Sequence, residues 1–202
     1  SSDLGTVAGL CAAAGARLVH MSTDYVFDGT KGSPYREDDE TGPASAYGRT
    51  KLAGERMVLE RLPGAAVVRT QWLYGKGGRN FVDTITDLAR RHGKVRVVND
   101  QRGSPTWARD LAAPISSIVE KGLSGIYHVS NTGSCTWFEF AKAIFSILNM
   151  NVETSPITSG ELERKAARPA NSVFDLTKLE GSTGIRMRGW MDALREYLAT
   201  GG

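Results

Sequence analysis

Short apolar runs alternate along the chain with longer segments of helix-forming residues. The runs contain many β-branched and few charged residues, as buried parallel strands do. We expect strands at 17–21, 65–69, 95–98 and 126–129, and helices at 5–14, 47–62, 81–92, 106–120 and 137–148, with a last helix from residue 190. Strands that alternate with helices are typical of a parallel sheet with helices on its faces. The pattern predicts an α/β fold.

Several helix ends carry their own signals. Gly93 is expected to end the helix that begins at residue 81, because glycine readily takes the left-handed conformation at a helix C-terminus. Thr136 and Glu139 have the spacing of a capping box and predict a helix start. Pro114 is expected to kink its helix. From about residue 149 to residue 188 the pattern predicts irregular structure.

Candidate chemistry follows the first predicted strand. Thr23 lies just beyond that strand, and in open α/β sheets ligands bind at the carboxyl ends of strands. Tyr47 and Lys51 are four residues apart, so on a helix they share one face. An ammonium group close to a phenol favours the phenolate and makes a better proton donor and acceptor near neutral pH. These three residues together are typical of a carbonyl reductase.

Six motifs occur in order and cover the chain nearly end to end. They are STDYVFDG (22–29), YGRTK (47–51), RTQWLYG (69–75), NF (80–81), GSPTWARDLA (103–112) and ARPANSVFD (167–175). In this order they resemble the dTDP-4-dehydrorhamnose reductase family, which belongs to the extended short-chain dehydrogenases/reductases. Six ordered motifs are far more specific than the Tyr-Lys pair alone.

The resemblance implies a Rossmann-like, doubly wound parallel sheet with a small C-terminal α/β substrate-binding part. It implies that residues 1–75 form the C-terminal portion of the NAD(P)-binding domain, with the catalytic helix. Residues 76–202 would bind substrate, with segments between about 95 and 130 returning to the sheet. The implied activity is NAD(P)H-dependent reduction of the 4-keto group of dTDP-4-dehydro-L-rhamnose to dTDP-L-rhamnose, a step of nucleotide-sugar biosynthesis for cell-envelope polysaccharide.

The resemblance also assigns roles to particular residues. Thr23, Tyr47 and Lys51 would be catalytic, and Ser22 would join Tyr47 and Lys51 in binding NADPH or NADH. The substrate would be bound by Thr23, Asp24, Tyr25, Trp72, Asn80, Phe81 and Arg168. A guanidinium suits a diphosphate, and an indole can stack on a sugar or a base, although a surface arginine and a core tryptophan are the plain alternatives. The loop 103–106 would shape the pocket or cap a helix through Thr106.

Other functions remain open. Related sugar-nucleotide dehydratases carry an acidic pair after the threonine, whereas Tyr25 follows Asp24 here, so dehydration is disfavoured. Another sugar-nucleotide reductase or an epimerase is an alternative, although epimerases usually have small residues at these two positions. A non-catalytic subunit like the regulatory partner of methionine adenosyltransferase is a third. The intact Thr23, Tyr47 and Lys51 argue against that role without excluding it.

No glycine-rich turn of the dinucleotide-binding type follows a strand in this chain. We therefore expect the first half of the cofactor-binding unit to lie outside these 202 residues, and the chain alone to be inactive. The residue that distinguishes NADH from NADPH would lie in that half, so cofactor preference cannot be predicted.

Composition limits the partners. The net charge of +3 is mild and the basic residues form no run, so we expect a dTDP-sugar as partner and no nucleic acid. No apolar stretch reaches about 18 residues and no signal peptide is apparent, so we expect a cytoplasmic protein without membrane contact. Cys11 and Cys135 are expected to be reduced, with a disulfide as the lesser alternative. We expect no metal site, because the acidic run 37–40 has no histidine nearby. A homodimer is possible.

Overall fold

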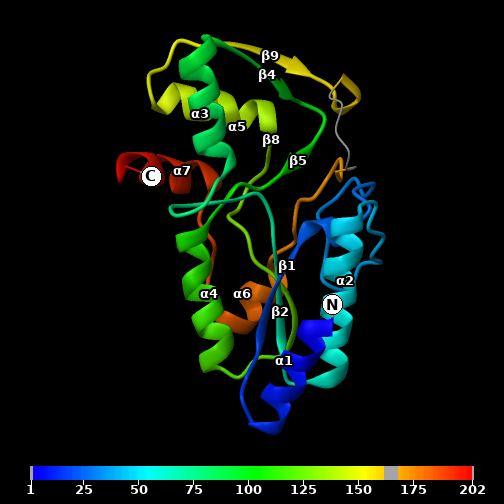
Figure 1. Ribbon diagram of the computed structural model, residues 1–202. Helices are drawn as coiled ribbons and strands as arrows, with labels where there is room; N and C mark the ends of the chain where they lie inside the picture. Colours follow the sequence, from blue (N-terminus) through cyan, green and yellow to red (C-terminus); the bar gives the residue numbers. More distant parts are fainter. Residues whose placement is uncertain (1, 162–167, 202) are drawn as a thin grey trace.

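A computed structural model describes residues 2–161 and 168–201. Its central sheet has three parallel strands, β1 (Val19–Thr23), β2 (Ala66–Thr70) and β7 (Gly125–His128), in the order β1-β2-β7. Every residue of β2 is buried, because this strand lies between the other two and has helices on both faces. The predicted α/β class with a parallel sheet is confirmed (Figure 1).

Four helices cover the two faces of this sheet. Helices α1 (Ser2–Ala13) and α2 (Ala46–Arg61) pack together on the side of β1, where Ala8, Val58 and Ala65 form a small core. Helices α4 (Ala108–Glu120) and α6 (Thr177–Thr183) lie on the opposite side (Figure 1). There, Ile118 and Leu179 are fully buried against the strands. The sheet is thus held rigidly between two apolar layers.

A second lobe is built around another pair of parallel strands, β4 (Lys94–Val98) and β9 (Glu153–Ile157). Helices α3 (Phe81–His92) and α5 (Trp137–Ile147) pack against these strands, and α7 (Trp190–Ala199) packs on α5 (Figure 1). Their shared core is the largest apolar cluster among the described residues and includes Phe140 and Ile144. This lobe therefore has a hydrophobic core of its own.

Short paired segments connect the lobes. Strand β3 (Leu73–Tyr74) pairs with β6 (Thr106–Trp107), and β5 (Arg102–Gly103) pairs with β8 (Cys135–Thr136). Two single-turn helices, η1 (Asp24–Val26) and η2 (Ser159–Glu161), follow β1 and β9. The described cysteines Cys11 and Cys135 are both free. Of the segment 95–130, β7 lies in the central sheet, whereas β4 pairs with β9 in the second lobe.

The local signals at helix ends are confirmed. Gly93 ends α3 in the left-handed conformation, with φ 66°. Both hydrogen bonds of the capping box between Thr136 and Glu139 are present at the start of α5. Pro114 lies inside α4, and the expected kink stays a prediction.

Three predictions about elements are wrong. The strand expected at 17–21 is β1 (Val19–Thr23), so Thr23 is its last residue and does not follow it. The helix expected from residue 106 begins at Ala108, because Thr106 and Trp107 pair with β3, and Thr106 is not its N-cap. The region 149–188 is not irregular throughout, since it holds β9 and α6. β9 has the sequence ETSPI, whose three central residues are polar or proline, and its outer side is exposed, so apolar periodicity could not identify it.

Candidate functional site

A cavity of about 540 Å³ opens at the carboxyl ends of β1 and β2. Every residue predicted for the site lines this cavity except Asn80 and Phe81. The lining side chains come from the end of β1, from η1, from the start of α2 and from the residues after β2, with Arg168 added from the segment before α6. The topology therefore brings together motifs that are up to about 145 residues apart in sequence.

Tyr47 projects from the first turn of α2. Ser45 caps this helix, and its hydroxyl accepts a hydrogen bond of 3.0 Å from the Gly48 N–H. A Cβ at Gly48 would lie 2.1 Å from the Tyr25 carbonyl oxygen, so only glycine lets the helix approach η1 this closely. The Tyr47 ring meets the Tyr25 ring edge-on, with 5.5 Å between centroids, and the Tyr47 side chain remains 55% exposed. Its phenol is therefore available to a ligand in the cavity.

Lys51 lies one turn further along the same face of α2. Its Nζ donates a hydrogen bond of 2.5 Å to the Met21 carbonyl oxygen in β1, which fixes the ammonium beside the cavity. Partial burial lowers the pKa of Lys51, and the negative charge of Glu55 opposes that shift. One of three ammonium hydrogens is used by Met21, so the group can still donate to other oxygens.

Thr23 and Asp24 form a buried pair at the end of β1. The Thr23 hydroxyl donates a hydrogen bond of 2.9 Å to Asp24 Oδ1. Asp24 is only 2% exposed, and this burial raises its pKa to about 6, although the hydrogen bond from Thr23 and the charge of Arg168 work in the opposite direction. A carboxyl group that titrates near pH 6 therefore sits directly beside the hydroxyl predicted to hold the reacting oxygen.

A buried ion pair lies next to these residues but does not line the cavity. Arg69 in β2 contacts the Glu55 carboxylate through Nη2 at 2.7 Å and Nε at 3.0 Å, and both side chains are 2% exposed. The Ser22 hydroxyl donates to the same carboxylate, so its proton is directed away from the cavity. Glu55 and Arg69 were not among the predicted site residues. The available signal was the four-residue step from Lys51 to Glu55 on one helix face.

Trp72 both lines the cavity and packs on another aromatic residue. Its indole stacks on that of Trp137, with 3.6 Å between centroids and 8° between planes. Trp72 has φ 45°, a left-handed conformation that is unfavourable for a tryptophan. A Cβ at Gly103 would lie 2.5 Å from the Trp72 indole, so the loop 103–106 needs a glycine there. Trp72 thus packs on another ring and also lines the cavity, and its stacking on a sugar or a base stays a prediction.

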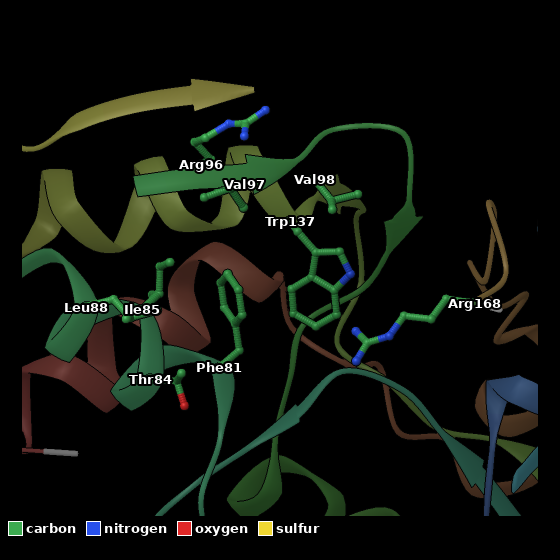
Figure 2. Close-up of a pocket in the computed structure, with 9 residues that line it drawn as sticks. All are labelled: Phe81, Thr84, Ile85, Leu88, Arg96, Val97, Val98, Trp137 and Arg168. Atoms are coloured by element: carbon green, nitrogen blue, oxygen red, sulfur yellow. The ribbon is translucent and has the colours of Figure 1, made fainter. Parts of the chain in front are cut away.

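A second, smaller cavity of about 180 Å³ adjoins the aromatic stack. Phe81 and Trp137 lie side by side on one of its walls, with 4.6 Å between ring centroids, and Arg168 reaches in from the opposite side (Figure 2). Arg168 lines both cavities and is exposed. Its neighbour in the motif, Ala167, lies outside the described residues. Phe81 therefore belongs to the second cavity.

Asn80 has a local structural task. Its side-chain oxygen accepts a hydrogen bond from the Asp83 N–H and caps α3. Its Nδ2 donates to the Gly75 carbonyl oxygen at 3.0 Å and to Asp83 Oδ2 at 2.7 Å. Asn80 lines neither of the two cavities described above. Its predicted contact with substrate thus has no support from the geometry.

Other observations bear on metals and membranes. Within 2–161 and 168–201, no group of three or more His, Cys, Asp or Glu side chains could hold a metal ion. In the acidic run, Asp39 forms an ion pair with Lys31, and Glu37 accepts a hydrogen bond from the His128 N–H. None of the described helices is both long enough and apolar enough to span a bilayer.

Comparisons with known proteins agree with the motifs. A spore coat polysaccharide biosynthesis protein of Bacillus subtilis is 45% identical over 184 residues, which are 91% of this chain and 64% of that protein. A dTDP-4-dehydrorhamnose reductase of Streptomyces griseus is 46% identical, over 92% of this chain and 64% of that enzyme. The structure of dTDP-4-dehydrorhamnose reductase from Bacillus anthracis in complex with NADP matches with a TM-score of 0.94 and 43% identity, over 98% of this chain and 70% of that one.

The chain spans less than two thirds of the length of these two curated relatives. A family model described as the RmlD substrate binding domain matches residues 2–201. The match runs through all six motifs, including those that line the two cavities. This chain therefore belongs to the RmlD substrate-binding domain family.

Proposed function

We propose that the protein containing this chain reduces the 4-keto group of dTDP-4-dehydro-L-rhamnose with NADPH or NADH, forming dTDP-L-rhamnose. The observation that carries this proposal is the convergence of Thr23, Tyr47 and Lys51 on one cavity. A hydroxyl, a phenol and an ammonium are the groups that polarise a ketone and deliver a proton to its oxygen. The names of these relatives support the same substrate class.

Each residue has a defined task in this reaction. Tyr47 donates the proton to the ketone oxygen as that oxygen gains negative charge, and its exposed phenol allows this contact. Lys51, held by Met21, stabilises the phenolate that remains on Tyr47. Thr23 donates a hydrogen bond to the reacting oxygen and so orients the ketone, once its hydroxyl turns from Asp24, to which it donates in the structure. Tyr25 and Trp72 supply aromatic surface to the sugar.

The chain offers suitable groups for the nicotinamide side of the cofactor. When bound, NADPH or NADH supplies the hydride. The Lys51 ammonium fits its ribose hydroxyls, because Lys51 lines the cavity and Met21 uses only one of its three hydrogens. Ser22 is a weaker candidate for this role, since its hydroxyl donates to Glu55.

Arg168 is proposed to bind the diphosphate of the substrate. Its guanidinium lines both the cavity of about 540 Å³, here called the reaction cavity, and the cavity of about 180 Å³, here called the aromatic cavity. This places a positive charge between them. A nucleotide sugar has the same layout, with a diphosphate between its sugar and its base. Phe81 and Trp137 then provide an apolar wall for the base. We further propose that the protein acts in the cytoplasm, where sugar nucleotides are made, and does not bind nucleic acid.

The competing proposal is a regulatory subunit without catalysis. It requires no proton donor, so the intact Tyr47 and Lys51 favour the enzyme. To separate the two, the full gene product that contains this chain is mixed with dTDP-4-dehydro-L-rhamnose and NADPH or NADH, and oxidation of the cofactor is followed by absorbance. Formation of dTDP-L-rhamnose, identified by mass spectrometry and NMR, is the expected result. Binding of the sugar nucleotide without turnover would contradict the proposal.

A further inference from the structure

Gln71 follows β2 within the RTQWLYG motif and lines the cavity of about 540 Å³, although it was not among the predicted site residues. Its side chain is 2% exposed. Its Oε1 accepts two hydrogen bonds, one of 2.9 Å from the Ser104 backbone N–H and one of 3.0 Å from the Ser172 hydroxyl. Both serines come from distant parts of the chain, and neither lines the cavity. The amide of Gln71 is therefore fixed from behind by two loops.

These contacts distinguish the oxygen of the Gln71 amide from its nitrogen. A backbone N–H can only donate, so the atom that meets Ser104 has to be the oxygen. The NH₂ group then faces away from both serines. Nε2 is buried and has no hydrogen-bond partner among the residues that the structure describes. A buried amide donor without a partner is destabilising, so it calls for an explanation.

The neighbouring side chain of Thr70 also has a buried polar atom without a hydrogen-bond partner among the described residues. That atom is its hydroxyl oxygen, and Thr70 lines the same cavity. Thr70 is the register partner of Thr23 across the β1–β2 pair. Two unsatisfied polar groups thus lie at the carboxyl ends of β1 and β2, where the reacting oxygen is expected. Their common explanation is an oxygen-rich ligand that satisfies both.

The loop 103–106 is shaped for holding this amide. A Cβ at Gly103 would lie 2.9 Å from Gln71 Oε1 and 2.5 Å from the Trp72 indole. Only glycine lets the following Ser104 N–H come within hydrogen-bond distance of the amide oxygen. This gives the GSPT motif a role in the cavity, since Thr106 does not cap α4.

We propose that Gln71 binds the sugar of the substrate, donating a hydrogen bond from Nε2 to one of its hydroxyl or carbonyl oxygens. This inference rests on the proposed function and adds a specificity residue to it. A neutral amide suits the uncharged oxygens of a sugar, whereas the diphosphate is better matched by the charged Arg168. Gln71 therefore distinguishes the sugar nucleotide from the free nucleotide.

The test compares binding of dTDP-L-rhamnose and of dTDP by calorimetry to the full gene product and to its Gln71→Met variant. Methionine keeps the length of the side chain and removes the amide. We expect the variant to bind dTDP-L-rhamnose about tenfold or more weakly and dTDP within about twofold of wild type, as for the loss of one hydrogen bond to the sugar. Gln71→Glu serves as a second variant, because it keeps an oxygen for Ser104 and replaces the NH₂ donor with a carboxylate oxygen, which accepts rather than donates.

Gln101→Met is the matched control. Gln101 is also buried, at 6% exposed, but it lines neither cavity and its Nε2 donates to the Ser159 hydroxyl. Unchanged binding of dTDP-L-rhamnose to both Gln71 variants would overturn the inference alone, as would equal weakening of both ligands. If wild-type protein binds neither ligand, the proposed function fails first and this inference falls with it.

Discussion

Tyr47 is the residue on which the proposed chemistry depends most. It is the predicted proton donor, and its phenol is exposed at the cavity. We expect Tyr47→Phe to lower kcat by about a hundredfold or more, with a KM for the sugar nucleotide within about threefold of wild type, since the proton is transferred only in the transition state. Steady-state kinetics measure both constants. Tyr127→Phe is a control tyrosine in β7, outside the cavity. Activity of Tyr47→Phe within threefold of wild type would remove Tyr47 from the mechanism.

Asp24 leads to a prediction about pH. Burial raises its pKa from an ordinary value of 3.8 to about 6, so between these values the folded protein binds a proton that the unfolded chain has lost. Its contribution to the free energy of unfolding therefore decreases as the pH rises from about 4 to about 6, by an amount on the order of 3 kcal/mol. Asp24→Asn removes this dependence. We expect the variant to gain stability relative to wild type across that window, measured by urea unfolding at several pH values.

A constant difference between Asp24→Asn and wild type from pH 4 to 7 would contradict that explanation. His128 titrates in the same range with the opposite sign, because burial lowers its pKa to about 3. Its contribution to stability is lost as the pH falls below 6.5, in wild type and variant alike. Taking the difference between the two proteins at each pH therefore isolates Asp24 from His128.

Residues differ in how well the sequence alone could identify them. The convergence of Thr23, Tyr47 and Lys51 on one cavity was predictable because it depends on local spacing and on one strand end. Gln71 was not, because its role depends on Ser104 and Ser172, which are 33 and 101 residues away. Asn80 caps α3, a contact that its own sequence neighbourhood explains, and its contact with substrate stays a prediction.

At the scale of elements, one buried ion pair joins α2, β1 and β2. Arg69 and Glu55 lie at the centre of this junction, and Ser22 contacts the pair from β1. The same three elements carry Lys51, Thr23 and Thr70, so the ion pair positions the groups proposed for catalysis, and neither Arg69 nor Glu55 lines the cavity. Helix α2 needs this anchor because its apolar periodicity is weak and few of its side chains are buried.

Breaking the ion pair on one side should be more harmful than removing it. We expect Arg69→Met to lower the free energy of unfolding by about 3–5 kcal/mol, because it leaves the Glu55 carboxylate buried without its partner. The double variant Arg69→Met/Glu55→Gln should recover a large part of this loss, since no unpaired charge remains. Chemical denaturation of the wild type, both single variants and the double variant measures the coupling. Purely additive effects would show that the pair contributes no specific stabilisation.

Elements with strong local signals were predicted well, and elements defined by distant contacts were not. Helix α3 has both of its caps in the sequence, and its bounds were predicted to the residue. Strand β9 exists because it pairs with β4, about 60 residues earlier, and its own sequence contains a proline and few apolar residues. Pairing of this kind is a property of the fold, so no local pattern reports it.

On the scale of the whole molecule, the two lobes meet at the Trp72–Trp137 stack. Trp72 follows β2 of the central sheet, and Trp137 begins α5 of the second lobe. The stack offsets the unfavourable left-handed backbone of Trp72. The reaction cavity lies on one side of this contact and the aromatic cavity on the other, so a substrate that occupies both would span the two lobes.

Arg168 is the described charged residue common to both cavities, and its removal tests whether one ligand occupies them together. We expect Arg168→Ala to raise the KM for the sugar nucleotide about tenfold or more and to lower kcat much less, because a diphosphate contact stabilises ground and transition states alike. Arg168→Lys should restore part of the affinity, since it keeps the charge but loses the planar fork. Arg56→Ala is the control, because Arg56 is exposed on α2 and lines neither cavity. Arg168→Ala should weaken the binding of both dTDP and dTDP-L-rhamnose, whereas Gln71→Met should weaken only the binding of dTDP-L-rhamnose. An unchanged KM in Arg168→Ala would show that the diphosphate lies elsewhere.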